Sequence, residues 1–99
     1  MQVTRTDQDT ETVLKVEGTL DATTAPELQP MVDALVAERR LSVTIALSGL
    51  KLIDSSGVGV IVSLFKRCRA NGGAVRIVGI RDQPRAIFRL LRLDRAFNI

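Results

Sequence analysis

The run Asp54-Ser55-Ser56-Gly57 is the part of this sequence whose residue types could do chemistry. It follows the apolar pair Leu52-Ile53 and precedes apolar residues at helical spacing, which places it between a short strand and a helix. Backbone amides at a helix start lack intrahelical partners, so a hydroxyl of Ser55 or Ser56 can cap the helix. A serine on an open helix start is also within reach of a protein kinase. From spacing alone, the interpretations as a helix cap and as a phosphate acceptor both stay open.

A nucleotide site is a third possibility, because helix starts bind anions. However, the glycine spacing and the following lysine of a phosphate-binding loop are missing, and Asp54 would repel a bound phosphate. We therefore favour an approach surface for another protein. Gly57 and Gly59 would serve it by keeping the first turn of the helix free of side chains.

The chain has no histidine and one cysteine, which excludes the common histidine and cysteine metal sites and most nucleophile–base pairs, although carboxylates alone could still hold a hard cation. The sequence therefore predicts a protein that is not an enzyme and that uses no metal or cofactor. Cys68 is expected to be a small core residue, and a lone thiol suits a reducing cytoplasm. No apolar run reaches the roughly 20 residues that span a bilayer, so we expect no membrane insertion.

Charge is divided unevenly along the chain. Residues 1–50 carry four basic and eight acidic side chains, a net charge of −4, whereas residues 51–99 carry ten basic and three acidic ones, a net charge of +7. A basic half can indicate nucleic-acid binding, but no aromatic stacking platform or groove-reading motif accompanies it, so no direct nucleic-acid contact is predicted. The basic residues are better explained as solvated helix faces, and a surface for an acidic protein partner stays open: Lys66, Arg67, Arg69, Arg85, Arg89 and Arg92.

Strands are predicted where β-branched and alternating residues occur between turn residues. The predicted strands are residues 3–6, 12–17, 41–47 and 74–78, with the short pair Leu52-Ile53 as a buried entry to the serines and residues 96–99 as a last edge strand. The alternation at 41–47 places Leu41, Val43, Ile45 and Leu47 on one face of the strand.

Helices are predicted where apolar residues recur at helical spacing. In the first helix, Thr23 or Thr24 can cap the free amides and Pro26 fits the first turn, and Thr24 and Glu27 have the spacing of a capping box. The second runs from the serines to Asn71-Gly72-Gly73. The third covers residues 83–91, with Ile87, Leu90 and Leu91 facing inward. Alternating strands and helices predict a single α/β domain over residues 1–99, with a mixed sheet of about four to five strands packed against three or more helices.

Several segments, taken in order, resemble the STAS family of bacterial anti-sigma-factor antagonists. They cover nearly the whole chain, and the Asp-Ser-Ser-Gly element in its setting is the specific one: Gly18-Thr19-Leu20-Asp21, Thr24-Ala25, Leu28, Leu52 to Val60, Asn71-Gly72-Gly73, Ala86 to Leu91, and Leu93. The resemblance implies a single STAS-like domain.

The resemblance also implies a phosphorylation switch. In such proteins the serine directly after the aspartate, here Ser55, is phosphorylated by an anti-sigma factor that is also a GHKL-type serine kinase. The unphosphorylated form binds this kinase and frees the sigma factor, phosphorylation releases it, and a serine phosphatase resets it. The residues implied in partner binding are Asp21, Thr23, Asp54, Ser56, Gly57 and Val58. Among them, Asp21 and Asp54 would position Ser55 or contact the kinase, and Ser56 would cap the helix.

One residue departs from the family pattern. Thr19 stands where family members often carry an acid, which puts the affinity for the kinase, or the choice of partner, in question. An alternative function within the same fold is a STAS subunit or scaffold of a membrane transporter or another regulatory complex, without a phosphoswitch, in which Ser55 would only cap the helix.

Overall fold

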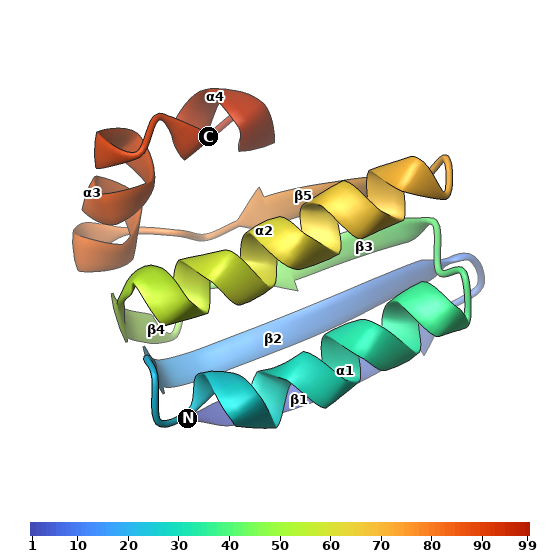
Figure 1. Ribbon diagram of the computed structural model, residues 1–99, viewed down its shortest axis with the longest axis horizontal. Coiled ribbons are helices and arrows are strands. Elements are labelled where there is room, and N and C mark those ends of the chain that lie inside the picture. The colour runs from blue at the N-terminus through green and yellow to red at the C-terminus, as the bar shows by residue number, and fades with distance from the viewer.

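A mixed five-stranded sheet forms one layer of the protein, as seen in a computed structural model that describes residues 1–99 (Figure 1). Its strands are β1 (Gln2–Gln8), β2 (Glu11–Leu20), β3 (Ser42–Ala46), β4 (Leu50–Ile53) and β5 (Ala74–Val78). The order is β1-β2-β3-β5, with β4 paired to the end of β2. Only β1 runs antiparallel to its neighbour, and the other pairs are parallel. The predicted α/β domain with a mixed sheet is confirmed.

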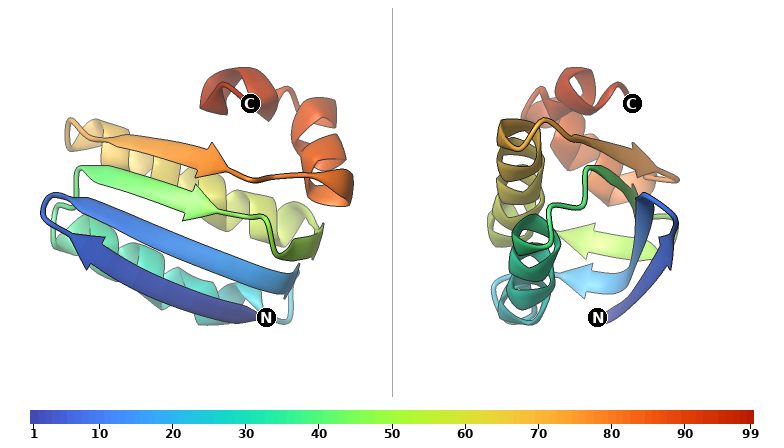
Figure 2. Two further views of the ribbon diagram at one scale, coloured as in Figure 1. Left: turned by 180° about the vertical axis from the view of Figure 1, so that it is seen from behind. Right: turned by 90° about the vertical axis from the view of Figure 1, so that its right-hand side faces the viewer.

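Two long helices form the second layer. The helices are α1 (Ala25–Ala37), α2 (Ser55–Ala70), α3 (Asp82–Leu90) and α4 (Leu93–Phe97). Both α1 and α2 cover the same face of the sheet, and no helix covers the opposite face (Figure 2). Of the two short helices, α3 lies against β4 and α4 lies beside β5. None of the four is long and apolar enough to cross a membrane.

The core follows from alternation in the strands and from apolar stripes on the helices. In β2, Leu14 and Val16 are buried while Lys15 between them is exposed, and β5 alternates in the same way. The predicted stripe of α2 is buried at Val58, Ile61, Leu64 and Cys68. Burial raises the pKa of the Cys68 thiol, as expected for a neutral core residue. The helix ends at Ala70 with Asn71 as its C-cap, and Gly72 follows with a φ of +85°, as predicted for this turn.

The predicted strand at residues 96–99 is wrong. Residues 93–97 form α4 instead, and its Phe97 packs against Phe65 and Phe88 with ring centroids 4.7 and 5.7 Å away. Because this aromatic cluster joins α2, α3 and α4, the end of the chain folds toward the helices and adds no strand to the sheet.

Three apolar side chains predicted to face inward in the third helix and the strand before the serines are exposed. Leu90 is 77% exposed and Leu91 is 50% exposed, because Phe88 is the residue by which α3 enters the core. Leu52 is 51% exposed because β4 buries Leu50 and Ile53 instead. Leu41, at 46%, precedes the first residue of β3 and lies outside the covered sheet.

Candidate functional site

The candidate site forms where β2 and β4 end side by side. These strands are parallel, and Leu20 of β2 pairs with Ile53 of β4. The residues that follow, Asp21 and Asp54, therefore leave the sheet at the same edge, although they are far apart in the sequence. The amide of Asp54 also donates to the carbonyl of Leu20, at 3.2 Å. The loop after β2 and the start of α2 are thus held against each other.

Asp54 caps α2 and connects it to the neighbouring loop. One carboxylate oxygen, Oδ1, accepts a hydrogen bond from the Gly57 amide, and Oδ2 accepts one from the Ala22 amide, each at 3.1 Å. The backbone of Asp54 is extended, as an N-cap requires. The prediction that Ser55 or Ser56 caps this helix is therefore wrong.

Both serine side chains are exposed at the start of α2. Ser55 is the first residue of the helix and Ser56 the second, and neither hydroxyl forms a hydrogen bond within the protein. Since Asp54 does the capping, the hydroxyl of Ser55 has no structural task and is available to a second molecule.

Asp21 organises the loop that precedes α1. Its Oδ1 accepts hydrogen bonds from the Thr23 hydroxyl at 2.6 Å, the Thr23 amide at 2.9 Å and the Thr24 amide at 3.2 Å. These bonds, the one from the Thr23 hydroxyl foremost, lower the pKa of Asp21 below its ordinary value. Asp21 therefore stays ionised, and it fixes the exposed Thr23 beside the site.

Thr24 closes the same loop but does not cap α1 with its side chain. Its hydroxyl accepts from the Asp21 amide and donates to the Thr19 carbonyl, both at 2.9 Å. Glu27 donates its backbone amide to the Thr24 carbonyl. The predicted capping box between Thr24 and Glu27 is therefore wrong, as is side-chain capping by Thr23 or Thr24.

Gly57 and Val58 lie beneath the surface of the site. A Cβ atom at Gly57 would stand 2.7 Å from the Leu20 carbonyl oxygen, so the glycine lets α2 start directly against the end of β2. The expectation that Gly57 leaves an open approach is wrong, whereas Gly59 does face open space. Val58 is a core residue, and its side chain is not available for partner contact.

A shallow hollow of about 330 Å³ lies beside the serines, between α1 and α2. It is lined by Ala22, Ala25, Pro26, Gln29, Ser56 and Val60. Most of this wall is small or apolar, so a side chain of another protein could enter it next to Ser55.

Gln83 supports the site, although it is not among the residues that the sequence predicts there. Its amide oxygen accepts from the Ile53 backbone amide at 2.9 Å, and its amide nitrogen donates to the Ile53 carbonyl at 3.0 Å. The side chain thus forms with β4 the two backbone hydrogen bonds that a neighbouring strand would form. No local pattern signals this contact, because it joins α3 to a strand far away in the sequence.

No three histidine, cysteine, aspartate or glutamate side chains converge to hold a metal ion. The arrangement that the structure does present is an exposed hydroxyl on a rigid helix start, with two aspartates held by neighbouring backbone amides.

Comparisons with known proteins agree with the fold, and the matched residues include those of the candidate site. The family model of the STAS domain matches residues 1–99. An anti-sigma-B factor antagonist of Staphylococcus aureus is 27% identical over 99 residues, which are 100% of this chain and 92% of that protein.

Two solved structures extend the comparison. An anti-sigma factor antagonist from Mycobacterium paratuberculosis is 26% identical, with a TM-score of 0.87 over 97% of this chain and 81% of that chain. The Bacillus cell fate determinant SpoIIAA in its phosphorylated form is 17% identical, with a TM-score of 0.79 over 95% of this chain and 86% of that chain, and it shares the fold.

Proposed function

Because this chain belongs to the STAS domain family, we propose that it is an anti-sigma factor antagonist whose partner binding is switched by phosphorylation of Ser55. It would act as a regulator and not as an enzyme. The names of the relatives in Staphylococcus aureus and in Mycobacterium paratuberculosis support the first part of this proposal. The second part is supported by the geometry around Ser55.

The observation that carries the proposal is the exposed, unbonded hydroxyl of Ser55 at the first position of α2. A helix that used this hydroxyl as its cap would be weakened by phosphorylation. Here Asp54 is the cap, so a phosphate on Ser55 would leave the Gly57 bond in place. The modification would therefore change the surface and not the fold.

The electrostatics of a phosphate at this position suit a reversible switch. A phosphoserine adds roughly −1.5 to −2 charges at neutral pH. Within the domain, the N-terminal end of the α2 dipole favours this negative charge. At an interface the same group brings desolvation and repulsion from acidic neighbours, which weakens binding by orders of magnitude.

The proposed partner is a GHKL-type anti-sigma factor that is also a serine kinase. It would dock over Ser55 and the hollow between α1 and α2, with Asp21, Thr23 and Ser56 at the contact. Asp54 and Gly57 would serve this contact indirectly, by fixing the loop and the helix start. A serine phosphatase would reset the switch, and we expect the cycle to take place in the cytoplasm.

The test compares four tagged variants by the proteins that co-purify with each: Ser55→Ala, Ser55→Asp, Ser56→Ala and Ser56→Asp. We expect a GHKL-type kinase on Ser55→Ala and at least a roughly hundredfold loss of it on Ser55→Asp. The Ser56 pair is the matched control, since it lies one residue further along the same helix. In a phosphorylation assay with the captured kinase, Ser55→Ala should accept no phosphate and Ser56→Ala should accept it normally.

Equal kinase capture by Ser55→Ala and Ser55→Asp would refute the switch. If both variants instead retained a transporter ATPase, the chain would be a subunit or scaffold of a transporter.

A further inference from the structure

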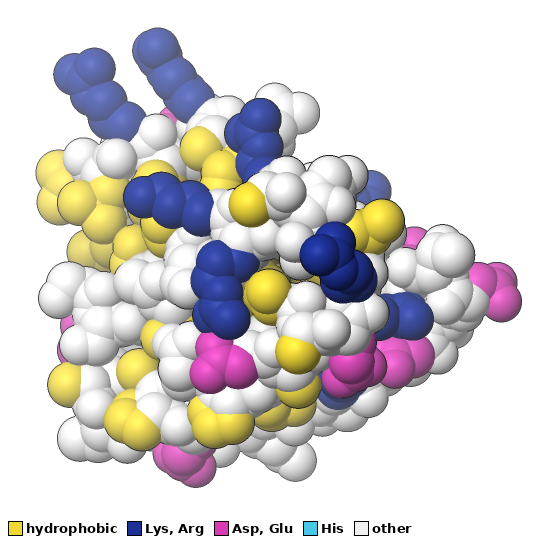
Figure 3. Space-filling view, turned by 45° about the vertical axis from the view of Figure 1, so that its right-hand side comes forward, with side chains coloured by type: hydrophobic (Ala, Val, Ile, Leu, Met, Phe, Trp, Pro, Cys, Tyr) yellow, Lys and Arg dark blue, Asp and Glu magenta, His cyan; other side chains and the backbone are white.

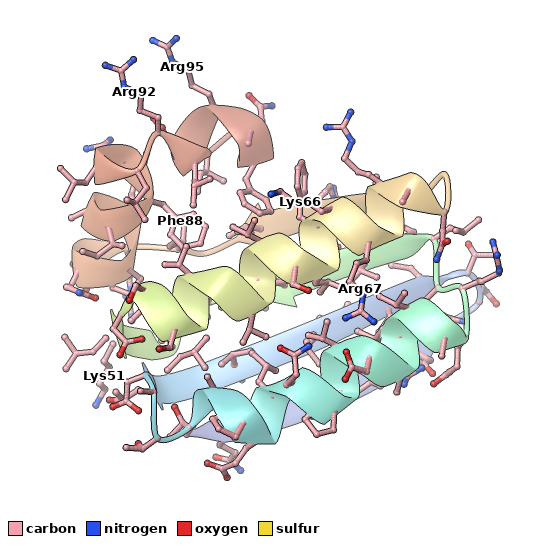
Figure 4. The ribbon with its side chains drawn as sticks, in the orientation of Figure 1. Lys51, Lys66, Arg67, Phe88, Arg92 and Arg95 are labelled. Carbon is pink, nitrogen blue, oxygen red and sulfur yellow. The ribbon has the colours of Figure 1, made fainter.

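The last part of the chain presents two exposed leucines among four exposed arginines. We call this the α3–α4 surface, and its residues are Arg85, Arg89, Leu90, Leu91, Arg92 and Arg95. Its exposed residues are arginine and leucine, unlike the serines and aspartates of the serine site. Arg92 and Arg95 point away from the rest of the domain (Figure 4). The space-filling view shows apolar side chains beside Lys and Arg side chains at this end of the molecule (Figure 3).

The four arginines have no acidic partner. The ion pairs of the protein involve other residues, and the acid of α3, Asp82, lies 4.0 Å from Arg81. The four guanidinium groups also donate no side-chain hydrogen bond, unlike those of Arg5, Arg40, Arg67 and Arg76. Four unpaired positive charges around two exposed leucines make this surface complementary to a negatively charged one that also offers apolar groups.

The shape of the surface limits which kinds of molecule could bind to it. None of the three hollows of the protein is lined by Leu90, Leu91 or the four arginines. Leu90 is 77% exposed and Leu91 is 50% exposed, and neither lines a hollow in which a peptide would be seated. A second copy of this chain is disfavoured, because a twofold contact would bring the same arginines face to face.

We propose that the α3–α4 surface adsorbs reversibly to anionic lipid bilayers. Arginine binds phosphate groups in a two-point geometry, and basic residues near a negatively charged lipid surface add to the affinity. Leu90 and Leu91 would enter the boundary between headgroups and acyl chains, as the apolar residues of interfacial helices do. No spanning helix is needed for such a contact, and the proposal is independent of the phosphorylation of Ser55.

The test is co-sedimentation with lipid vesicles. The full chain is mixed with vesicles of equal parts phosphatidylglycerol and phosphatidylcholine, and in parallel with vesicles of phosphatidylcholine alone. We expect binding to the anionic vesicles only, weakened by salt, and on the order of tenfold weaker binding for the double variant Arg92→Gln/Arg95→Gln. The variant Leu90→Ser/Leu91→Ser should also bind more weakly, and since both leucines are exposed it should fold normally.

The matched control is Arg39→Gln/Lys51→Gln, which removes the same charge from exposed, unpaired residues outside the α3–α4 surface and should bind like the unaltered chain. Equal binding to neutral vesicles, or equal losses in both charge variants, would overturn the proposal. Binding to duplex DNA but not to vesicles would overturn it in favour of a nucleic-acid surface.

Discussion

Gly57 and Gly59 stand two positions apart in α2, yet their surroundings are opposite. A Cβ atom at Gly57 would meet the Leu20 carbonyl oxygen at 2.7 Å, and backbone cannot yield cheaply. A Cβ atom at Gly59 would meet nothing within 4 Å. We therefore expect Gly57→Ala to destabilise the protein by about 1–3 kcal/mol, as overpacking does. Gly59→Ala should stabilise it by roughly 0.5–1 kcal/mol, because alanine favours a helix more than glycine does. Urea unfolding of the two variants measures both effects.

The pair also probes the surface at the serine site. Equal stability of the two alanine variants would show that α2 does not start against β2 as described. If Gly59→Ala is more stable but captures less kinase, then the open space at Gly59 serves the partner.

The identity of the cap shows where prediction at the level of single residues ends. The sequence indicated that Asp54-Ser55-Ser56-Gly57 begins a helix, and this is confirmed. It could not indicate which residue is the N-cap, because aspartate and serine are about equally good at this position. Which residue becomes the N-cap is decided by where β4 ends. That end is set by the pairing of Ile53 with Leu20 and by the hydrogen bond between Ile53 and Gln83.

At the level of elements, Gln83 attaches α3 to the strand that leads into the serine site. Replacing it by alanine would leave the amide and the carbonyl of the buried Ile53 without partners along that edge. We expect Gln83→Ala to cost about 1–3 kcal/mol of stability. Hydrogen exchange of the Ile53 amide should speed up more than that of the Leu14 amide in the middle of β2. If the two amides changed equally, the contact would support the whole domain and not β4 in particular.

The elements themselves were predictable where periodicity is long and failed where it is short. The thirteen residues of α1 and the sixteen of α2 carry clear helical stripes. By contrast, residues 96–99 form too short a run for periodicity to separate a strand from a helix. Their helical state depends on the contact of Phe97 with Phe65 and Phe88, which local sequence does not contain. The periodicity of α3 predicts Leu90 and Leu91 on its inward face, whereas the buried residue is Phe88, because its contact with Phe97 is likewise absent from the local sequence.

At the level of the whole molecule, ion pairs connect elements that are distant in the sequence. Arg5 of β1 contacts Glu38 after α1 at 2.7 Å and Asp7 of its own strand at 3.0 Å. Arg67 of α2 contacts Asp33 of α1 at 2.7 Å. These contacts lower the pKa of each carboxyl, through the hydrogen bond from Arg5 for Asp7 and Glu38 and from Arg67 for Asp33.

These pKa shifts give the stability a defined dependence on pH. A carboxyl whose pKa is lower in the folded state stabilises the fold above its unfolded pKa, about 4, and the contribution is lost as pH falls through the folded value. We expect the urea midpoint to fall on acidification, with a modest amplitude because the pairs are exposed. Arg5→Gln removes the largest cause of the pKa shifts of Asp7 and Glu38 at once. It should be less stable than the unaltered chain at neutral pH and approach it in acid, as urea titrations of both proteins across this range would measure. A stability difference that stayed constant down to acid pH would mean that Arg5 supports the fold by packing its alkyl chain and not by its charge.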